Sequence, residues 1–193
     1  MRCDEFSPKF NNEGGIYAGL LSPREEIAIR LHELRAILDK TQSRGGRGFK
    51  LKLHEQNPNA SLSPIYFNLK TPDNPKPGPL TLEIVNAIGQ QFYYLARDLK
   101  LKYNYVAGVP NAGDPFAEAF LRSVIQTPPD QVKLLKLKKE EAREQGGADE
   151  LKSLDYNLYS IFTISQLLNF YLERKIVNQE TFNEIKAYLR SNN

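Results

Sequence analysis

Residues 103–125 read YNYVAGVPNAGDPFAEAFLRSVI and describe a strand, a loop and a helix in that order. Tyr103 to Val109 is a short β-rich run, and Pro110-Asn111-Ala112-Gly113 ends it. Pro115 to Ile125 then has the pattern of a helix. In open parallel sheets such a loop lies at the carboxyl end of a strand, where ligands bind. The stretch therefore predicts an α/β unit whose loop is a candidate ligand site.

Upstream of this unit the sequence predicts a capped helix. Ser22 is a good N-cap, Pro23 suits the first helical position, and the pattern breaks at Ser43 to Gly48. Between these points apolar residues recur at helical intervals and form one buried stripe, which comprises Ile27, Leu31, Leu34 and Leu38. Residues 1–20 have little periodicity, and we expect a loosely ordered arm there.

A hairpin, a loop and a second helix are expected next. Phe49 to Leu53 and Ile65 to Leu69 have strand patterns on either side of a turn-rich segment, which predicts a hairpin. Thr71 to Pro79 holds four prolines and must be a loop. An amphipathic helix is then expected from about Thr81 to Leu99.

Downstream, strands and helices continue to alternate. Val132 to Leu137 and Leu158 to Phe162 are strand candidates, a helix capped by Thr163 or Ser165 follows, and Gln179 to Arg190 is the last helix. This order indicates an α/β fold with a mainly parallel sheet. We expect residues 1–193 to form a single domain.

Composition narrows the class of protein. The net charge of +3 is spread over 26 basic and 23 acidic residues without a basic stripe, so nucleic acid is a poor candidate partner. A lone Cys3 excludes an internal disulfide and fits the cytoplasm, and no apolar run is long enough to span a membrane. His32 and His54, the two histidines, are expected to be surface or structural residues.

Several short segments, taken in order, resemble the orotate phosphoribosyltransferases of the type I phosphoribosyltransferase family. The resemblance runs from about Leu31 to Leu189 and rests on the shared order and spacing of the segments. These are Phe49-Lys50-Leu51-Lys52, Ser63-Pro64-Ile65-Tyr66-Phe67-Asn68-Leu69-Lys70, Val106-Ala107-Gly108-Val109-Pro110, Arg143-Glu144-Gln145-Gly146-Gly147 and Ser160-Ile161-Phe162-Thr163.

The resemblance implies a function in pyrimidine nucleotide (UMP) synthesis. The family is a group of glycosyltransferases that transfer ribose 5-phosphate from phosphoribosyl pyrophosphate to orotate with magnesium, and its members are usually homodimers. It also implies a phosphoribosyltransferase-like parallel sheet flanked by helices, with a hood formed by the N-terminal helix and the hairpin. Any magnesium would arrive with phosphoribosyl pyrophosphate.

The resemblance also implies site residues. Lys52, Tyr66, Phe67 and Arg143 match positions that bind substrate, and Lys138 and Lys139 match the start of the mobile, catalytic basic loop. Fixed cations would stabilise the departing pyrophosphate, and an aromatic face with an arginine fork suits planar, anionic orotate. The alternative interpretation is that the lysines are solvated and that the two rings only pack the hairpin.

The element that defines the family cannot be found in this sequence. That element is an apolar strand ending in two acidic residues, followed by a Thr/Gly-rich turn, and it holds the ribose hydroxyls and the 5-phosphate. The family places it with a helix and a further strand ahead of the Arg143 motif, where Ala142 stands directly here. Glu140-Glu141 before Gly146-Gly147 imitates the pair, but the lysines before it are too charged for a buried strand.

The sequence therefore predicts a fold shortened by loss of a central strand-helix-strand segment, and it leaves three hypotheses. The first is an orotate phosphoribosyltransferase-like protein with lost or severely reduced activity, in which binding of phosphoribosyl pyrophosphate is doubtful. The second is a non-catalytic module that binds orotate or a related pyrimidine, or that dimerises. The third is a working enzyme that uses Glu140 and Glu141 on the sugar. Asn111 and Ala112, where the family carries an aromatic residue followed by Lys or Thr, weaken the expected pyrophosphate contact.

Overall fold

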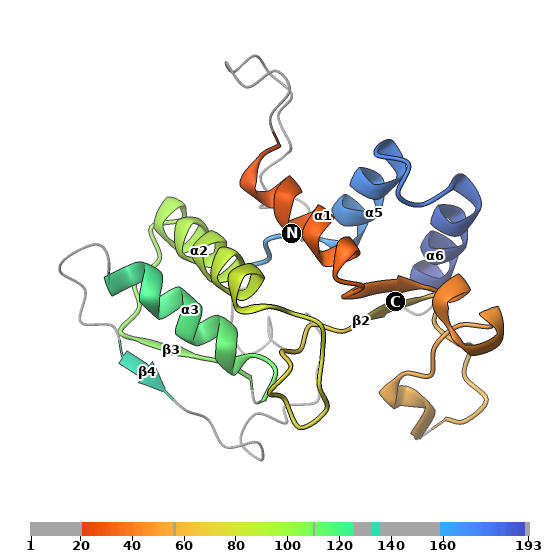
Figure 1. Cartoon of the computed structure of the whole chain (residues 1–193), viewed down its shortest axis with the longest axis horizontal. Coiled ribbons are helices and arrows are strands. Elements are labelled where there is room, and N and C mark those ends of the chain that lie inside the picture. The colour runs from red at the N-terminus through yellow and green to blue at the C-terminus, as the bar shows by residue number, and fades with distance from the viewer. Residues whose placement is uncertain (1–20, 56, 110, 126–132, 136–158, 192–193) are drawn as a thin grey trace.

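The computed structural model describes residues 21–55, 57–109, 111–125, 133–135 and 159–191 (Figure 1). Its α-helices are α1 (Pro23–Glu33), α2 (Leu82–Asp98), α3 (Asp114–Ile125), α5 (Ile164–Glu173) and α6 (Gln179–Ser191). Its strands are β1 (Ile37–Asp39), β2 (Ile65–Phe67), β3 (Tyr105–Ala107) and β4 (Lys133–Leu135), and short 3-10 helices are η2 (Lys40–Gln42), η3 (Arg44–Gly46) and η4 (Lys52–Glu55). No helix among the described residues is both long and apolar enough to cross a membrane.

The described strands form two small sheets. β1 pairs antiparallel with β2, and β3 pairs in parallel with β4. In Figure 1, α2 and α3 lie side by side next to β3 and β4, while α1, α5 and α6 gather around β1 and β2. The α/β class is confirmed, but the described strands build two separate sheets in place of one mainly parallel sheet. The expected loss of a central segment stays a prediction.

The first helix is shorter than its apolar stripe predicts. α1 begins as expected, with a capping box between Ser22 and Glu25, but it ends at Glu33. Arg35 has φ +56°, a left-handed conformation in which the helix cannot continue, and the Ala36 N–H bonds back to the Leu31 carbonyl at 2.9 Å. The expected helical position of Leu38 was therefore wrong, because this residue lies in β1.

The expected hairpin partner of β2 was also wrong. β2 pairs with β1, in a register that sets Ile37 opposite Phe67. Residues 49–53 contribute one antiparallel bridge, between Phe49 and Ser63, before the chain turns into η4. The reason is that the chain leaves the helix at Arg35, so that β1 lies beside β2 and pairs with it over three residues.

The other helices follow the sequence closely. Thr81 caps α2, and Thr163, not Ser165, caps α5 through a capping box with Gln166. Leu158 to Phe162 was expected to be a strand, but its described part, residues 159–162, has no regular structure. No described strand pairs with these residues, and Ile161 is buried in the core instead.

One core holds the fold together and joins α2 and α3 to α1, α5 and α6. It draws buried residues from α1, α2, α5 and α6, and includes Ala119 of α3. At its centre the hydroxyl of Tyr171, a residue only 1% exposed, donates to the Ala28 carbonyl at 2.6 Å and ties α5 to α1. Burial raises the pKa of the Tyr171 hydroxyl well above its usual value. The expected arm, residues 1–20, lies outside the described residues.

Candidate functional site

The loop after β3 is a tight turn built on two glycines. The Gly113 N–H donates to the Val109 carbonyl at 2.8 Å, and the Gly113 carbonyl accepts from the Phe116 and Ala117 amides. A Cβ at Gly108 would stand 2.4 Å from the Asp114 nitrogen, and one at Gly113 would stand 2.5 Å from the Val109 nitrogen. Only glycine allows the chain to fold this closely over the carboxyl end of β3.

This turn borders a large cavity. We call it the loop cavity; its volume is about 1100 Å³. It runs along β3, and Lys102 is the only charged residue among the described residues that line it. The lining includes Tyr103, Val106, Gly108, Val109, Gly113, Phe116 and Tyr159. The structure thus places an open space where the sequence predicts ligands to bind, at the carboxyl end of a parallel strand.

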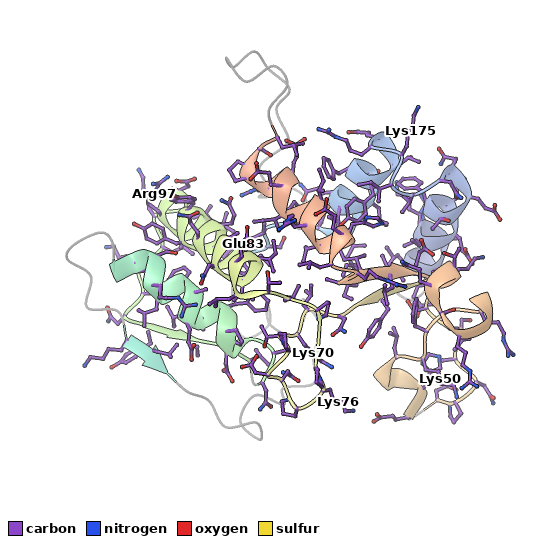
Figure 2. The ribbon with its side chains drawn as sticks, viewed as in Figure 1. Lys50, Lys70, Lys76, Glu83, Arg97 and Lys175 are labelled. Carbon is purple, nitrogen blue, oxygen red and sulfur yellow. The ribbon has the colours of Figure 1, made fainter. Side chains whose placement is uncertain are left out.

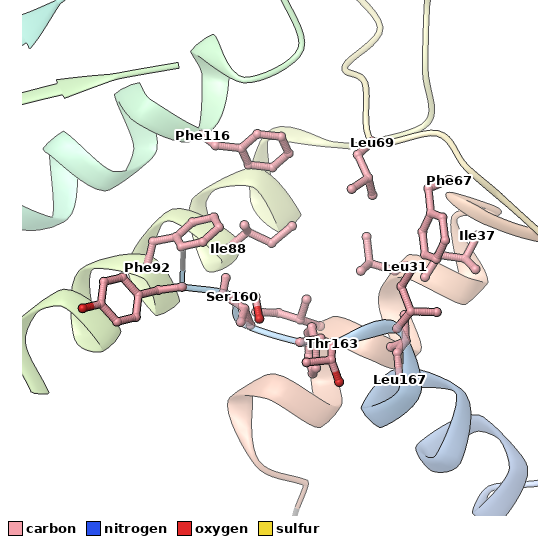
Figure 3. A pocket seen from close by; sticks show the side chains of 15 residues that line it. Leu31, Ile37, Phe67, Leu69, Ile88, Phe92, Phe116, Ser160, Thr163 and Leu167 are labelled. Atoms are coloured by element: carbon pink, nitrogen blue, oxygen red, sulfur yellow. The ribbon is translucent and has the colours of Figure 1, made fainter. Parts of the chain in front are cut away.

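Tyr66 and Phe67 point to opposite faces of the β1/β2 sheet, as neighbours in a strand must. The Tyr66 ring stacks on Phe49, with centroids 5.4 Å apart and planes at 27°. The Phe67 ring lines a different space on the other face (Figure 3). The two rings therefore cannot form one shared aromatic platform, although each could contact a ligand separately.

Lys52 begins η4, in a loop that His54 organises. The His54 ring is 8% exposed; its Nδ1 accepts from the Leu51 amide at 3.0 Å, and its Nε2 lies 3.1 Å from the Ala60 carbonyl. The Nδ1 atom also lies 3.0 Å from the Leu51 carbonyl, so both ring nitrogens contact the backbone of this loop. His54 is thus a structural residue, as expected, and it fixes the backbone that carries Lys52. His32 packs edge-on against Tyr171, with ring centroids 5.8 Å apart.

Three expected site residues, Lys138, Lys139 and Arg143, lie outside the described residues.

The proline-rich loop that follows β2 is described and carries Lys70 and Lys76 (Figure 2). Its ends are joined by the Thr71 carbonyl with the Gly78 amide and by the Lys70 carbonyl with the Leu80 amide. Within the described part of the chain, no three His, Cys, Asp or Glu side chains come together in a way that could hold a metal ion.

Asn68 is a candidate site residue to which the sequence analysis gave no role. Its backbone amide donates to the Ala36 carbonyl at 2.7 Å, which extends the β1/β2 pairing by one bond. Its Oδ1 atom is buried and has no hydrogen-bond donor among the described residues. A buried acceptor without a partner is costly and marks a place where a ligand could donate. Its position at the end of the Tyr66-Phe67-Asn68 run was the available signal.

A second space, the central cavity, has a volume of about 380 Å³ and is lined by α2 and α3 together with α1, β1, β2 and α5. Figure 3 shows Phe92, Ile88 and Phe116 on one side and Leu69, Phe67 and Leu31 on the other, with Ser160 and Thr163 between them. The full lining is Ile27, Leu31, Ile37, Phe67, Leu69, Ile88, Phe92, Phe116, Tyr159, Ser160, Ile161, Phe162, Thr163, Ile164 and Leu167. Phe92, Phe116 and Tyr159 line both cavities.

Comparison with solved structures shows a likeness in fold. The chain is similar to the UMP synthase of Leishmania donovani, with a TM-score of 0.58 and 18% sequence identity. The similarity covers 91% of this chain, which spans 43% of that protein's chain. No protein-family model and no curated protein matches the sequence.

Proposed function

We propose that this chain is an orotate phosphoribosyltransferase-like protein of pyrimidine nucleotide synthesis whose transfer activity is lost or severely reduced. One observation carries the proposal. The likeness in fold to a UMP synthase extends over 91% of the chain, and the segments that resemble orotate phosphoribosyltransferases occur in order along that length. A fold by itself hosts many functions, so the ordered segments supply the choice of substrate.

Two features at strand ends, one in each of the two sheets, support substrate binding. The glycine turn at residues 108–113 brings backbone against the loop cavity, and Asn68 offers a buried acceptor at the end of β2. A pyrimidine ring N–H could donate to that acceptor. Lys52, on a loop fixed by His54, and Arg143 would supply the cations for the orotate carboxylate and carbonyls.

The sequence between β4 and Arg143 supports the loss of activity. β4 ends at Leu135, and residues 136–142 alone separate it from Arg143. A strand-helix-strand unit needs roughly 30 residues, so no acidic pair and phosphate-binding turn on such a unit can occupy this interval. Without them a sugar phosphate and its magnesium ion have no cradle. Magnesium would therefore enter only with phosphoribosyl pyrophosphate, and weakly.

Turnover of the purified chain tests the proposal. With orotate, phosphoribosyl pyrophosphate and magnesium, we expect little or no orotidine 5′-monophosphate above a protein-free control. An intact orotate phosphoribosyltransferase assayed alongside shows that the conditions permit the reaction. Turnover comparable to that enzyme, abolished by the double substitution Glu140→Ala and Glu141→Ala, would contradict the proposal and favour a working enzyme that grips the sugar with these carboxylates.

Calorimetric titration with orotate tests the pyrimidine site. We expect a weak, saturable heat that is lost in Arg143→Ala and reduced about tenfold in Lys52→Ala, because each variant removes a charge-assisted hydrogen bond. Lys50→Ala is the matched control, since it removes an exposed lysine two positions away. A chain that gives no heat, or a control that loses as much affinity as Lys52→Ala, argues against an orotate site.

A homodimer belongs to the same proposal. Tyr105 in β3 and Val109 in the turn after it are 60% and 63% exposed and both line the loop cavity, although strands of parallel sheets are usually covered on both faces. We infer that a second copy of the chain covers them. Light scattering should give twice the chain mass, and the double substitution Tyr105→Ser and Val109→Ser should shift the mass to that of one chain. A monomer at high protein concentration would contradict this.

A further inference from the structure

The central cavity differs from the proposed substrate site in its electrostatics. Its lining comes from six elements (α1, β1, β2, α2, α3 and α5), from Leu69 and from residues 159–163, and none of the 15 lining residues carries a charge. Most are aliphatic or aromatic. Moving an unpaired charge into such a space is strongly unfavourable. The lining therefore favours an uncharged ligand over orotate, phosphate esters and other anions.

The few polar groups at the cavity are partly engaged. The Thr163 oxygen accepts from the Gln166 amide at 3.1 Å, as part of the cap of α5. The Thr163 amide donates to the Gln166 side chain at 2.9 Å. Tyr159 and Ser160 are the remaining polar residues in the lining. A ligand could thus form one or two hydrogen bonds here, but the rest of its surface would have to be apolar.

The size of the cavity suits a small ring. Ligand pockets range from about 300 to 1,000 Å³, and a dry cavity of about 150 Å³ is enough to bind benzene. This cavity measures about 380 Å³ and presents the rings of Phe67, Phe92 and Phe116 from three different elements. Aromatic side chains favour stacked or edge-to-face contact with another ring.

We propose that the central cavity is a binding site for a small, uncharged aromatic molecule. The site goes beyond the proposed function, because its ligand carries no charge and needs neither Lys52 nor Arg143. It gives Phe67 a role different from the one expected for it: its ring contacts the apolar ligand, and the polar end of β2 at Asn68 serves the pyrimidine.

The chain contains no tryptophan, so one tryptophan placed in the cavity reports on binding. Leu69→Trp is the first reporter because Leu69 lies at the cavity but is 38% exposed and tolerates a larger ring. Phe162→Trp is the second reporter, within the lining. The control is Tyr94→Trp, on α2 but outside the cavity lining, where Arg97 packs over the ring.

The probes are 4-nitrotoluene, which is neutral, and 4-nitrobenzoate, its anionic counterpart; nitroaromatic rings quench tryptophan fluorescence on contact. We expect 4-nitrotoluene to quench a cavity reporter with a saturable curve, and 4-nitrobenzoate to bind at least about tenfold more weakly. The Tyr94→Trp control should show only shallow, linear quenching. Equal affinity for the two probes, or no saturation in either folded reporter, would overturn the proposal.

Filling the cavity provides a second test. Ile88→Phe adds a ring from α2, and Leu167→Phe adds one from α5 if the first variant does not unfold cooperatively. Saturable quenching should disappear in the folded filled variant, and binding that persists would contradict the location.

Orotate separates this proposal from the proposed function. Orotate should not displace 4-nitrotoluene, and Arg143→Ala should leave quenching unchanged. Displacement by orotate would mean that the two sites are one and would overturn the inference. Loss of the orotate heat alone would leave the central cavity untouched.

Discussion

Gly89 sets the distance between α2 and α3, and replacing it with alanine tests this packing directly. A Cβ at position 89 would stand 2.4 Å from the Ala119 Cβ, 2.6 Å from the Ala119 carbonyl carbon and 2.7 Å from the Phe120 nitrogen. All three atoms belong to α3 and cannot rotate away. Since carbon atoms pack at about 3.5–4.0 Å, the helices would have to separate by about 1 Å.

We expect Gly89→Ala to lower the free energy of unfolding by about 1–2 kcal/mol. Overpacking a core costs about 1–3 kcal/mol, and the better helix propensity of alanine offsets up to about 1 kcal/mol. For a chain of this size the midpoint of thermal unfolding should fall by about 2–8 °C. Urea unfolding followed by circular dichroism measures the change. Gln90→Ala, at the neighbouring exposed position, should change stability by less than about 0.5 kcal/mol. A Gly89→Ala chain as stable as the unmodified one would refute the close approach.

Three further predictions concern stability and its pH dependence. Tyr171→Phe should lower the free energy of unfolding by about 1 kcal/mol, because the Ala28 carbonyl loses the hydrogen bond from the tyrosine hydroxyl. Because the pKa of this hydroxyl is raised in the folded protein, its contribution to stability is complete below pH ~10 and is lost as the pH rises above that value, so the stabilities of the two chains should converge at alkaline pH. Burial alone would raise the pKa of Glu25, but hydrogen bonds within the capping box and the Arg174 guanidinium at 3.5 Å hold the pKa below its usual value. The stability of the unmodified chain should therefore exceed that of Glu25→Gln above the usual glutamate pKa, and this difference should vanish as the pH falls through the lowered pKa of the folded protein. Parallel curves of stability against pH for the two chains would contradict this. His54→Ala should free the backbone of residues 51–60, so amide exchange there should accelerate while α2 stays protected; uniform acceleration would argue against a local role.

Features encoded locally were predicted well from the sequence. Ser22 caps α1 as expected, and Thr163, one of the two expected candidates, caps α5, because a cap depends on a few adjacent residues. The end of α1 could not be predicted in this way. Leu34 and Leu38 continue the helical spacing, and only the pairing of β1 with β2 explains why the chain leaves the helix at Arg35. Tertiary pairing overrode local preference there.

The candidate site also has parts that the local sequence predicts and parts that only the tertiary fold creates. The glycine turn after β3 was visible in the sequence, because glycine and proline mark turns directly. The central cavity was not visible, since its lining is drawn from residues between Ile27 and Leu167 that no single segment brings together. The opposite directions of Tyr66 and Phe67, in contrast, follow from the predicted strand itself, because neighbouring residues in a strand point to opposite faces.

A crystal structure of the chain soaked with phosphoribosyl pyrophosphate, magnesium and orotate tests the central claim most directly. We predict density for orotate beside Asn68 and Arg143, and none for the sugar phosphate. Phosphoribosyl pyrophosphate seated with magnesium in a formed pocket would contradict the claim that this protein has lost the means to hold it.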